Sequence, residues 1–384
     1  MHFYDFAGYC SMINDETRMS AYAGALREAV TKDSIVLDLG SGTGIFSFLA
    51  CKFGAKKVYS VEPNPLVHLS KQFAALNDCA DKIEFIEKLS SEIDLEEKAD
   101  ILVCDLHGTL PIFEESLVSI IDARKRLLKP GAVLIPKRET VFFAVSECLE
   151  VYEKNIEASM REFHEIKMSS ARHLLTNRVM NTSGKEMSLL SEPQIFAVLD
   201  YATIEEIDFS ATLEFEITQK GTANGLRAWF ECELGANLTT TNSMENLETV
   251  YGAPFFPFDE AVEVEPGDRV ETAVSATHEK GEYVWNWHTK IYSSSDEKSL
   301  KAEFQQSTLR GLFIPPKTIL KRSEYFVPTQ NTEAKIDAFI LNKMDGEMMN
   351  GDIAEELQAN FPEKFKTFDE ALEKVSQLAQ RYGE

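Results

Sequence analysis

The sequence is poor in positive charge, in cysteine and in long apolar runs. Its 384 residues include 39 Lys and Arg against 63 Asp and Glu, which gives a formal net charge of −24. This balance argues against non-specific binding to nucleic acid or to an anionic membrane surface, because both require basic patches. An acidic protein suits a cationic substrate, although acidity also serves solubility alone.

No apolar run approaches the roughly 18 residues of a membrane-spanning helix, so we expect no transmembrane segment and no membrane partner. Residues 1–5 lack the basic flank and the apolar stretch of a signal peptide. The six cysteines stand singly and form no C-x-x-C pair, which argues against a zinc site and a disulfide framework. We therefore expect a cytoplasmic protein with reduced thiols and no metal.

A glycine-rich turn follows the first strand pattern. Residues 35–39 are apolar over the length of a strand, and residues 45–53 read as the start of a helix. Between them the glycines have G-x-G-x-G spacing: Gly40, Gly42 and Gly44. A strand, a glycine turn and a helix in this order are typical of a nucleotide-binding half-site. A tight turn in an unrelated α/β protein is the alternative.

A second apolar run, residues 58–61, ends in Glu62, about twenty residues beyond the first glycine. A carboxylate at the end of that strand can accept hydrogen bonds from ribose hydroxyls. A dinucleotide site would need its third glycine one residue later, at the G-x-G-x-x-G spacing. Together with Asp38, the turn instead resembles the S-adenosylmethionine loop of class I methyltransferases.

The chain changes character along its length. From residue 35 to 143, strand and helix patterns alternate, which predicts a parallel sheet with helices on both faces. Beyond residue 145, apolar and polar residues alternate, which predicts an antiparallel β-barrel or sandwich. The expected fold class is therefore α/β: a Rossmann-like, doubly wound class I methyltransferase sheet, then this β domain, then a small helical module. The expected segments are cofactor-covering helices over 1–30, the sheet domain over 31–145, the β domain over 146–328 and the module over 332–384.

Three helical patterns follow residue 332. Asp345-Gly346 separates the first two, and Thr367 with Glu370 predicts a capping box before the third. The module resembles the winged-helix-type or peptide-chaperone-type domains that guide peptide-modifying enzymes to leader peptides. Its acidic character argues against DNA binding.

A class I methyltransferase domain followed by a β domain resembles the protein arginine methyltransferase family. The similarity runs from about residue 4 to residue 289 and is strongest over 36–136. Residues 1–29 read as one helical region, in which the stretch from Met12 to Arg18 is similar to the family's N-terminal helix. The resemblance implies that Arg18 clamps the carboxylate of S-adenosylmethionine. The cofactor-binding residues that it implies are Met12, Arg18, Asp38, Gly40, Gly42, Gly44, Glu62 and, beside the adenine, Glu92.

The signature of that family is a loop with two glutamates that hold the arginine guanidinium. The matching stretch is residues 104–116, where Asp105 replaces the first glutamate and Glu114 aligns with the second. Two carboxylates suit a guanidinium, because it carries a full charge and a planar fork of donors. Glu115 takes the place of Glu114 if the register differs by one residue. A cap and a solvated helix start are the structural alternative for Asp105 and Glu114.

Other positions depart from the family pattern. Its Thr-His-Trp loop beside the active site corresponds to residues 249–251, so the histidine is missing and Tyr251 replaces the tryptophan. Tyr9 stands where the family usually has a histidine. His107 on the substrate loop could supply a base, although a lone loop histidine is more often a surface or capping residue. These differences indicate a divergent member with its own substrate.

Residues 162–189 fall where the family inserts an arm that makes a head-to-tail dimer. Apolar residues of this segment, among them Phe163, Ile166 and Met168, could form the contacts of a homodimer. A helical hairpin that packs on its own β domain is the alternative.

The sequence thus predicts an enzyme, an S-adenosylmethionine-dependent N-methyltransferase of an arginine guanidinium in a peptide, a protein or a small molecule. The expected catalytic residues are Asp105, Glu114 and His107, and the expected substrate contacts are Tyr9, Glu115 and Tyr251. Catalysis would rest mainly on proximity. Two alternatives stay open: methyl transfer to an amine, an imidazole or a hydroxyl, and a non-catalytic scaffold that binds S-adenosylmethionine and recruits a peptide.

Overall fold

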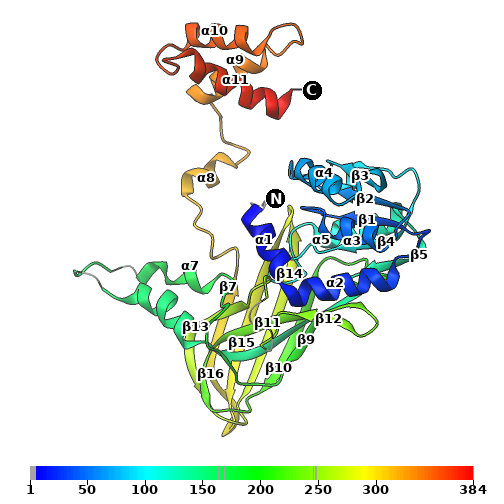
Figure 1. The fold of residues 1–384 in the computed structure, drawn as a ribbon. Helices are drawn as coiled ribbons and strands as arrows, with labels where there is room; N and C mark the ends of the chain where they lie inside the picture. Colours follow the sequence, from blue (N-terminus) through cyan, green and yellow to red (C-terminus); the bar gives the residue numbers. More distant parts are fainter. Residues whose placement is uncertain (1–5, 163, 168, 245, 247–248, 384) are drawn as a thin grey trace. The chain divides into compact units, whose positions relative to one another are not determined.

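In the computed structural model the chain forms two units, Met1–Phe313 and Ile314–Glu384. The structure describes residues 6–162, 164–167, 169–244, 246 and 249–383. The ends of the predicted segments at residues 1–5 and 384, and the arm residues Phe163 and Met168, lie outside the described residues. Figure 1 shows the helices and strands of both units.

The N-terminal part of the first unit is a five-stranded parallel sheet with the order β3-β2-β1-β4-β5. In such a sheet the strand order reverses between β1 and β4, and ligands bind beyond the carboxyl ends of the strands at that point. The glycine turn follows β1 directly, and the loop of residues 105–115, called the substrate loop below, follows β4. The strands are β1 (Ile35–Leu39), β2 (Lys57–Val61), β3 (Ile83–Ile86), β4 (Ala99–Cys104) and β5 (Leu128–Ile135).

Helices flank this sheet (Figure 1). The sequence predicts one helical region over residues 1–29, but the structure divides it at Asp15. The Asp15 carboxylate accepts a hydrogen bond from the backbone N–H of Arg18 at 3.0 Å and so caps a second helix. The helical elements are α1 (Phe6–Asn14), α2 (Glu16–Ala29), α3 (Ile45–Lys52), α4 (Val67–Leu76), η1 (Ala80–Lys82), η2 (Ser90–Glu92) and α5 (Ser116–Arg126).

Two antiparallel sheets form the β domain. One has four strands in the order β10-β14-β15-β16, and the other has seven, with the path β7-β13-β11-β6-β8 and with β9 and β12 paired to β6 and β11. The strands are β6 (Arg138–Glu147), β7 (Met180–Asn181), β8 (Ser188–Leu189), β9 (Gln194–Asp200), β10 (Phe209–Glu216), β11 (Gly221–Gly235), β12 (Leu238–Thr241), β13 (Pro254–Val264), β14 (Arg269–Glu279), β15 (Glu282–Ser293) and β16 (Asp296–Ser307).

Short helical segments lie between β6 and β7. They are α6 (Leu149–Val151), η3 (Tyr152–Ile156), η4 (Glu157–Met160), η5 (Ser169–Ala171) and α7 (Arg172–Thr176). The expected arm, residues 162–189, therefore contains η5, α7, β7 and β8.

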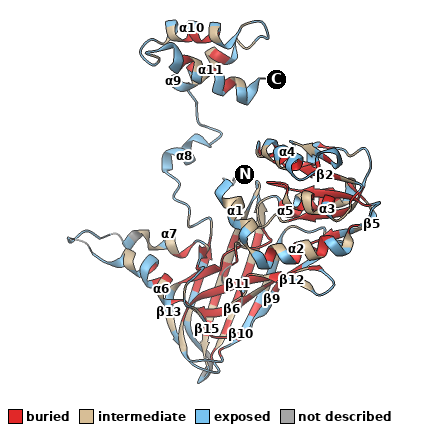
Figure 2. Ribbon diagram, in the orientation of Figure 1, coloured by how far each residue is buried: buried red, intermediate tan, exposed pale blue. Residues whose placement is uncertain are grey.

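One apolar core joins the parallel sheet to the β domain (Figure 2). Val36 of β1 and Phe143 of β6 are both fully buried in it. Helix α2 is tied to the sheet, because the hydroxyl of its buried Tyr22 donates a hydrogen bond to the carbonyl of Cys104 at 3.3 Å. The carboxyl edge of the sheet is thus held against the β domain.

The second unit has a core of its own, built from Ile336, Ile340, Leu357 and their neighbours. The predicted capping box is confirmed: the Thr367 side chain accepts from the backbone N–H of Glu370, and the Glu370 side chain accepts from that of Thr367. The helices are α8 (Pro316–Lys321), α9 (Thr332–Leu341), α10 (Asn350–Asn360) and α11 (Phe368–Tyr382).

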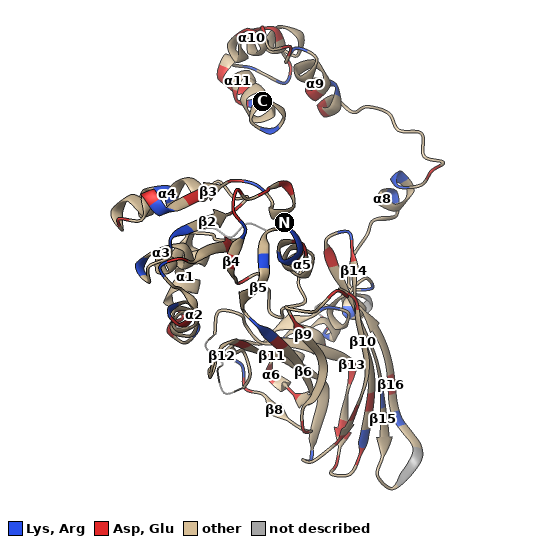
Figure 3. Cartoon of the chain, turned by 90° about the vertical axis from the view of Figure 1, so that its right-hand side faces the viewer, with Lys and Arg blue, Asp and Glu red and all other residues tan. Residues whose placement is uncertain are grey.

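The predicted fold class is confirmed: a doubly wound parallel sheet, then an antiparallel β domain, then a helical C-terminal part. Asp and Glu residues occur along the strands of the β domain and on the C-terminal helices (Figure 3). Within the described residues, no helix is both long and apolar enough to cross a membrane, and no group of three potential metal ligands occurs.

Because the C-terminal helices have a core of their own, a destabilising substitution in this core should leave the stability of the first unit unchanged. Replacing the fully buried Ile340 by alanine should destabilise this unit by about 2–4 kcal/mol, because the substitution leaves a cavity. Amide hydrogen exchange on the full chain should then speed up over residues 332–382 and stay unchanged in β1 and β2. Leu341→Ala, at a position 40% exposed on the same helix, is the matched control. Faster exchange across the parallel sheet as well would contradict independent cores.

Candidate active site

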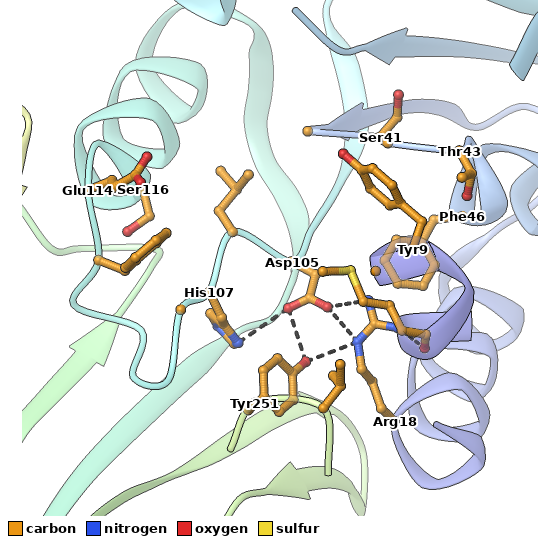
Figure 4. Close-up of a pocket in the computed structure, with 18 of the residues that line it drawn as sticks. Tyr9, Arg18, Ser41, Thr43, Phe46, Asp105, His107, Glu114, Ser116 and Tyr251 are labelled. Carbon is orange, nitrogen blue, oxygen red and sulfur yellow. Dashed lines mark hydrogen bonds and ion pairs between the residues drawn. The ribbon is translucent and has the colours of Figure 1, made fainter. Parts of the chain in front are cut away.

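A cavity of about 600 Å³ lies where the parallel sheet meets the β domain. Its walls come from α1, the glycine turn after β1, the end of β2, the loop after β4 and residues 250–251. Figure 4 shows the side chains around it. The predicted site residues that line the cavity are Tyr9, Met12, Arg18, Gly40, Gly42, Glu62, Asp105, His107, Glu114, Glu115 and Tyr251.

The glycine turn has the shape that its sequence predicts. Gly40 and Gly42 have φ angles of 69° and 53°, in the left-handed region that favours glycine. Glu62 fixes the turn, because its carboxylate accepts hydrogen bonds from the backbone N–H groups of Gly42 at 2.8 Å and Asn64 at 2.9 Å. Burial raises the pKa of Glu62, and these hydrogen bonds oppose the shift.

Three predicted cofactor residues, Asp38, Gly44 and Glu92, are described by the structure but do not line the cavity. Asp38 is buried behind the turn, where Oδ2 accepts from the backbone N–H of Ser47 at 2.8 Å and from its hydroxyl at 2.6 Å. Gly44, with a φ of 83°, is the N-cap of α3. Glu92 ends η2, and its carboxylate accepts from the backbone N–H of Leu89 at 3.3 Å.

Arg18 and Asp105 form a buried ion pair. The Nε of Arg18 donates to Oδ2 of Asp105 at 2.6 Å, and Nη2 contacts the same oxygen. Nη1 donates to the backbone carbonyl of Met12 at 2.9 Å. Burial alone would raise the pKa of Asp105, but the Arg18 guanidinium and His107 hold that pKa below its ordinary value. The structure thus places the fork of Arg18 on Asp105.

Tyr251 contacts this pair from the β domain. Its hydroxyl donates to Oδ1 of Asp105 at 3.0 Å and accepts from Nε of Arg18 at 3.2 Å. The same Asp15 that caps α2 holds the loop of Tyr251, since its Oδ2 accepts from the Thr249 hydroxyl at 3.1 Å. The N-cap of α2 therefore also positions a β-domain loop in the cavity.

His107 is buried beside Asp105, with 4% of its side chain exposed. Its Nδ1 lies 3.2 Å from Oδ1 of Asp105, and its Nε2 lies 2.7 Å from Oε1 of Glu139. Burial would lower the pKa of His107, but the Glu139 and Asp105 carboxylates together raise it above its ordinary value. The other Glu139 oxygen accepts from the hydroxyl of Tyr201.

Glu139 and Tyr201 belong to the site in the structure, although the sequence alone assigns neither of them a role. Glu139 is the second residue of β6 and is followed by the apolar run 141–145. A glutamate next to an apolar strand is rarely buried without a partner, so this pattern indicates a paired carboxylate. Its partner His107 lies on a loop far away in sequence, and only the fold brings the two side chains together.

Glu114 and Glu115 both line the cavity, in different settings. Glu114 has a φ of 38°, which is uncommon for a residue other than glycine and marks a candidate functional position. Glu115 is the N-cap residue of α5, and its carboxylate lies 3.6 Å from Nε2 of His278 in β14.

Asp38 gives a prediction about stability and pH. Burial raises the pKa of Asp38 from 3.8 to about 7 in the folded chain, although hydrogen bonds from Ser47 oppose the shift. The folded chain then binds a proton more tightly than the unfolded chain, so Asp38 makes stability fall as pH rises from about 4 to about 7. Asp38→Asn should remove about 3 kcal/mol of that decrease.

Urea unfolding at a series of pH values, without cofactor, measures this slope. The fluorescence of the three tryptophans follows it, because Trp229, Trp285 and Trp287 all belong to the first unit. Asp33→Asn, at an exposed position before β1, should leave the slope unchanged. Equal slopes for wild type and Asp38→Asn would contradict the raised pKa.

The known proteins to which this chain is similar are methyltransferases. The sequence profile of the ribosomal protein L11 methyltransferase (PrmA) family matches residues 16–158. Protein arginine N-methyltransferase 2 of Dictyostelium discoideum is 29% identical over 231 residues, 57% of this chain and 45% of that protein. Probable protein arginine N-methyltransferase 6 of Arabidopsis thaliana is 28% identical over 233 residues, 58% of this chain and 53% of that protein. The chain spans about half the length of these two relatives.

Solved structures of named arginine methyltransferases share the fold of this chain. The Trypanosoma brucei PRMT1 enzyme–prozyme heterotetrameric complex with AdoHcy matches with a TM-score of 0.71 at 18% identity, over 79% of this chain and 98% of that chain. At this identity the match shows a shared fold. The two curated proteins are named protein arginine N-methyltransferases, and this chain is similar to them at 28–29% identity.

Proposed function

We propose that this chain is an S-adenosylmethionine-dependent N-methyltransferase of a guanidinium nitrogen, in an arginine of a peptide, a protein or a small molecule. The observation that carries the proposal is a single cavity that joins the glycine turn and Glu62 to the carboxylates of the substrate loop. The likeness to named arginine methyltransferases supports it.

The residues on the sheet side of the cavity fit S-adenosylmethionine. Each Glu62 oxygen accepts one backbone N–H and keeps a second lone pair for a ribose hydroxyl. A Cβ on Gly42 would lie 2.4 Å from the Tyr9 ring, so glycine is what lets Tyr9 pack against the turn in the cavity wall. When bound, the cofactor supplies an electrophilic methyl group on a sulfonium. We assign Met12, Arg18, Gly40, Gly42 and Glu62 to its binding, with Asp38, Gly44 and Glu92 as support.

The substrate loop would then bind and orient the acceptor. The charge of Asp105 is shared with Arg18 and Tyr251, whereas Glu114 brings a second carboxylate to the same cavity. We assign to Glu114 the main charge–charge contact with the guanidinium, and to Asp105 the orientation of the acceptor nitrogen. Methylation of a guanidinium releases one proton, which the Glu114 carboxylate can accept. Proximity supplies most of the rate.

Methyl transfer to another nucleophile, an amine, an imidazole or a hydroxyl, is the second candidate. The specific observation in its favour is that both oxygens of Asp105 are engaged by Arg18, Tyr251 and His107. A carboxylate has about four lone-pair positions, so little of Asp105 remains for a substrate fork. A non-catalytic scaffold is the third reading, and the experiment below separates all three.

We also propose a cytoplasmic homodimer that meets through residues 162–189. The six free cysteines fit a reducing compartment. Within this segment Ile166 is 61% exposed, so its apolar side chain is available for contact with a second copy of the chain. The heterotetrameric assembly of the Trypanosoma brucei relative supports an oligomer.

Turnover with methyl-labelled S-adenosylmethionine tests the function. The acceptors are free arginine, agmatine, arginine-rich peptides and the same peptides with lysine or histidine in place of arginine. We expect label to transfer to guanidines alone. Transfer to lysine or histidine peptides alone would move the function to the second candidate. Cofactor binding without transfer to any acceptor would leave the scaffold.

Glu114 and Glu115 offer a matched pair of variants. Glu114→Gln should lower kcat/KM for the guanidine by about a hundredfold or more, because it removes the charge that holds the substrate cation. The Kd of S-adenosylmethionine should stay unchanged. Glu115→Gln, one residue away and next to His278, should change kcat/KM by less than about threefold. The opposite ranking would give the role to Glu115.

A further inference from the structure

Four side chains whose charges can alternate in sign follow one another from the β domain to α2. Glu139 contacts His107, His107 contacts Asp105, and Asp105 contacts Arg18. The side-chain exposures of Glu139, His107, Asp105 and Arg18 are 0%, 4%, 9% and 5%. With His107 protonated, the row holds two cations and two anions and is neutral as a whole.

Glu139 reaches this row from the β domain. It lies on β6, where its neighbours across the sheet are Cys232 of β11 and Leu199 of β9. Its carboxylate has the imidazole on one oxygen and the hydroxyl of Tyr201 on the other. A fully buried carboxylate is tolerated only when it is paired and hydrogen-bonded. Tyr201 supplies the hydrogen bond, and His107 is the basic group within ion-pair distance of Glu139.

The His107 ring is also fixed in orientation. It packs against the rings of Phe230 and Tyr251, with centroids 5.0 and 5.1 Å away. Each ring nitrogen lies within ion-pair distance of a carboxylate oxygen, although neither contact has hydrogen-bond geometry. An imidazole can pair with two carboxylates at once only when both of its nitrogens carry a proton. A neutral imidazole would leave one of the two carboxylates facing a lone pair.

We propose that Glu139 is a positioning residue that acts through His107: it keeps the imidazole a cation, and this cation and Arg18 together fix the Asp105 carboxylate for the reaction. The inference rests on the proposed methyl transfer and goes beyond it, because it gives His107 a proton-holding role and brings in a β-domain glutamate. Asp105 is one methylene shorter than glutamate, so its place depends on the groups that hold it.

The raised pKa of His107 supports this arrangement, since burial opposes the shift and the Glu139 and Asp105 carboxylates together outweigh burial. As pH rises through that raised pKa, the imidazole loses its proton and Oδ1 of Asp105 loses a cation. The titratable and charged groups around this site are Asp105, Glu139, Arg18, Tyr251, Tyr201, Tyr22, Cys104 and Cys232.

Glu139→Gln tests the proposal in the full chain, because glutamine keeps the size of the side chain and removes its charge. The pKa of His107, read from its ring resonances by NMR, should fall. The alkaline limb of kcat/KM should move to lower pH, so that activity drops by about tenfold on that limb and by less than about twofold on its acidic side. Glu231→Gln, at an exposed position on the neighbouring β11, is the matched control and should change neither.

A second variant covers the case in which Glu139→Gln fails to fold. His107→Leu combined with Glu139→Leu removes both charges together, and buried ion pairs replaced in this way usually leave a folded protein. The double variant should bind S-adenosylmethionine with wild-type Kd. Its kcat/KM should be at least about tenfold lower and should lack the alkaline limb. Wild-type kcat/KM in the double variant would overturn the proposal.

The two proposals fail in different ways. A wild-type chain that methylates no guanidine or other acceptor, whatever the His107 pKa does, would overturn the proposed function and, with it, the catalytic part of this inference. A wild-type chain that methylates guanidines, with a His107 pKa and pH profile unmoved by Glu139→Gln, would overturn this inference alone.

Discussion

The buried ion pair between Arg18 and Asp105 ties together the three parts that make the cavity. Arg18 lies on α2, Asp105 directly follows β4 of the parallel sheet, and Tyr251 of the β domain contacts both. Pairs of this kind tolerate no loss of one partner, because the remaining charge stays buried and uncompensated. The cap at Asp15 is a second tie among the same parts, since one carboxylate holds both the start of α2 and the loop before Tyr251.

Local features of this site were predictable because consecutive residues encode them. Strand, glycine turn and strand-end Glu62 fall within one short stretch, and the structure reproduces them with the Glu62–Gly42 contact. The division of the N-terminal helix at Asp15 was missed, because helical periodicity continues on both sides of it. The Arg18–Asp105 pair joins residues 87 apart in sequence. No sequence pattern states such a pairing, so the side-chain partners of both residues had to come from the fold.

The site and the surface of this protein follow different electrostatic rules. The surface is strongly acidic, and its long-range field is weakened by salt within about a Debye length. Inside, the charges from Glu139 to Arg18 alternate in sign and are shielded from ions by burial. Salt should therefore alter how a cationic substrate approaches far more than how the buried groups are arranged.

Helix α1 has a consequence for how ligands enter and leave the cavity. It supplies Gly8, Tyr9, Ser11, Met12 and Ile13 to the cavity wall, yet none of its nine residues is fully buried. A short helix with so little buried surface opens at a small local free energy, well below that of unfolding the whole unit. A spent ligand can therefore leave by the fraying of one helix. The rate of opening of α1 would then set how fast a ligand in the cavity exchanges with solvent.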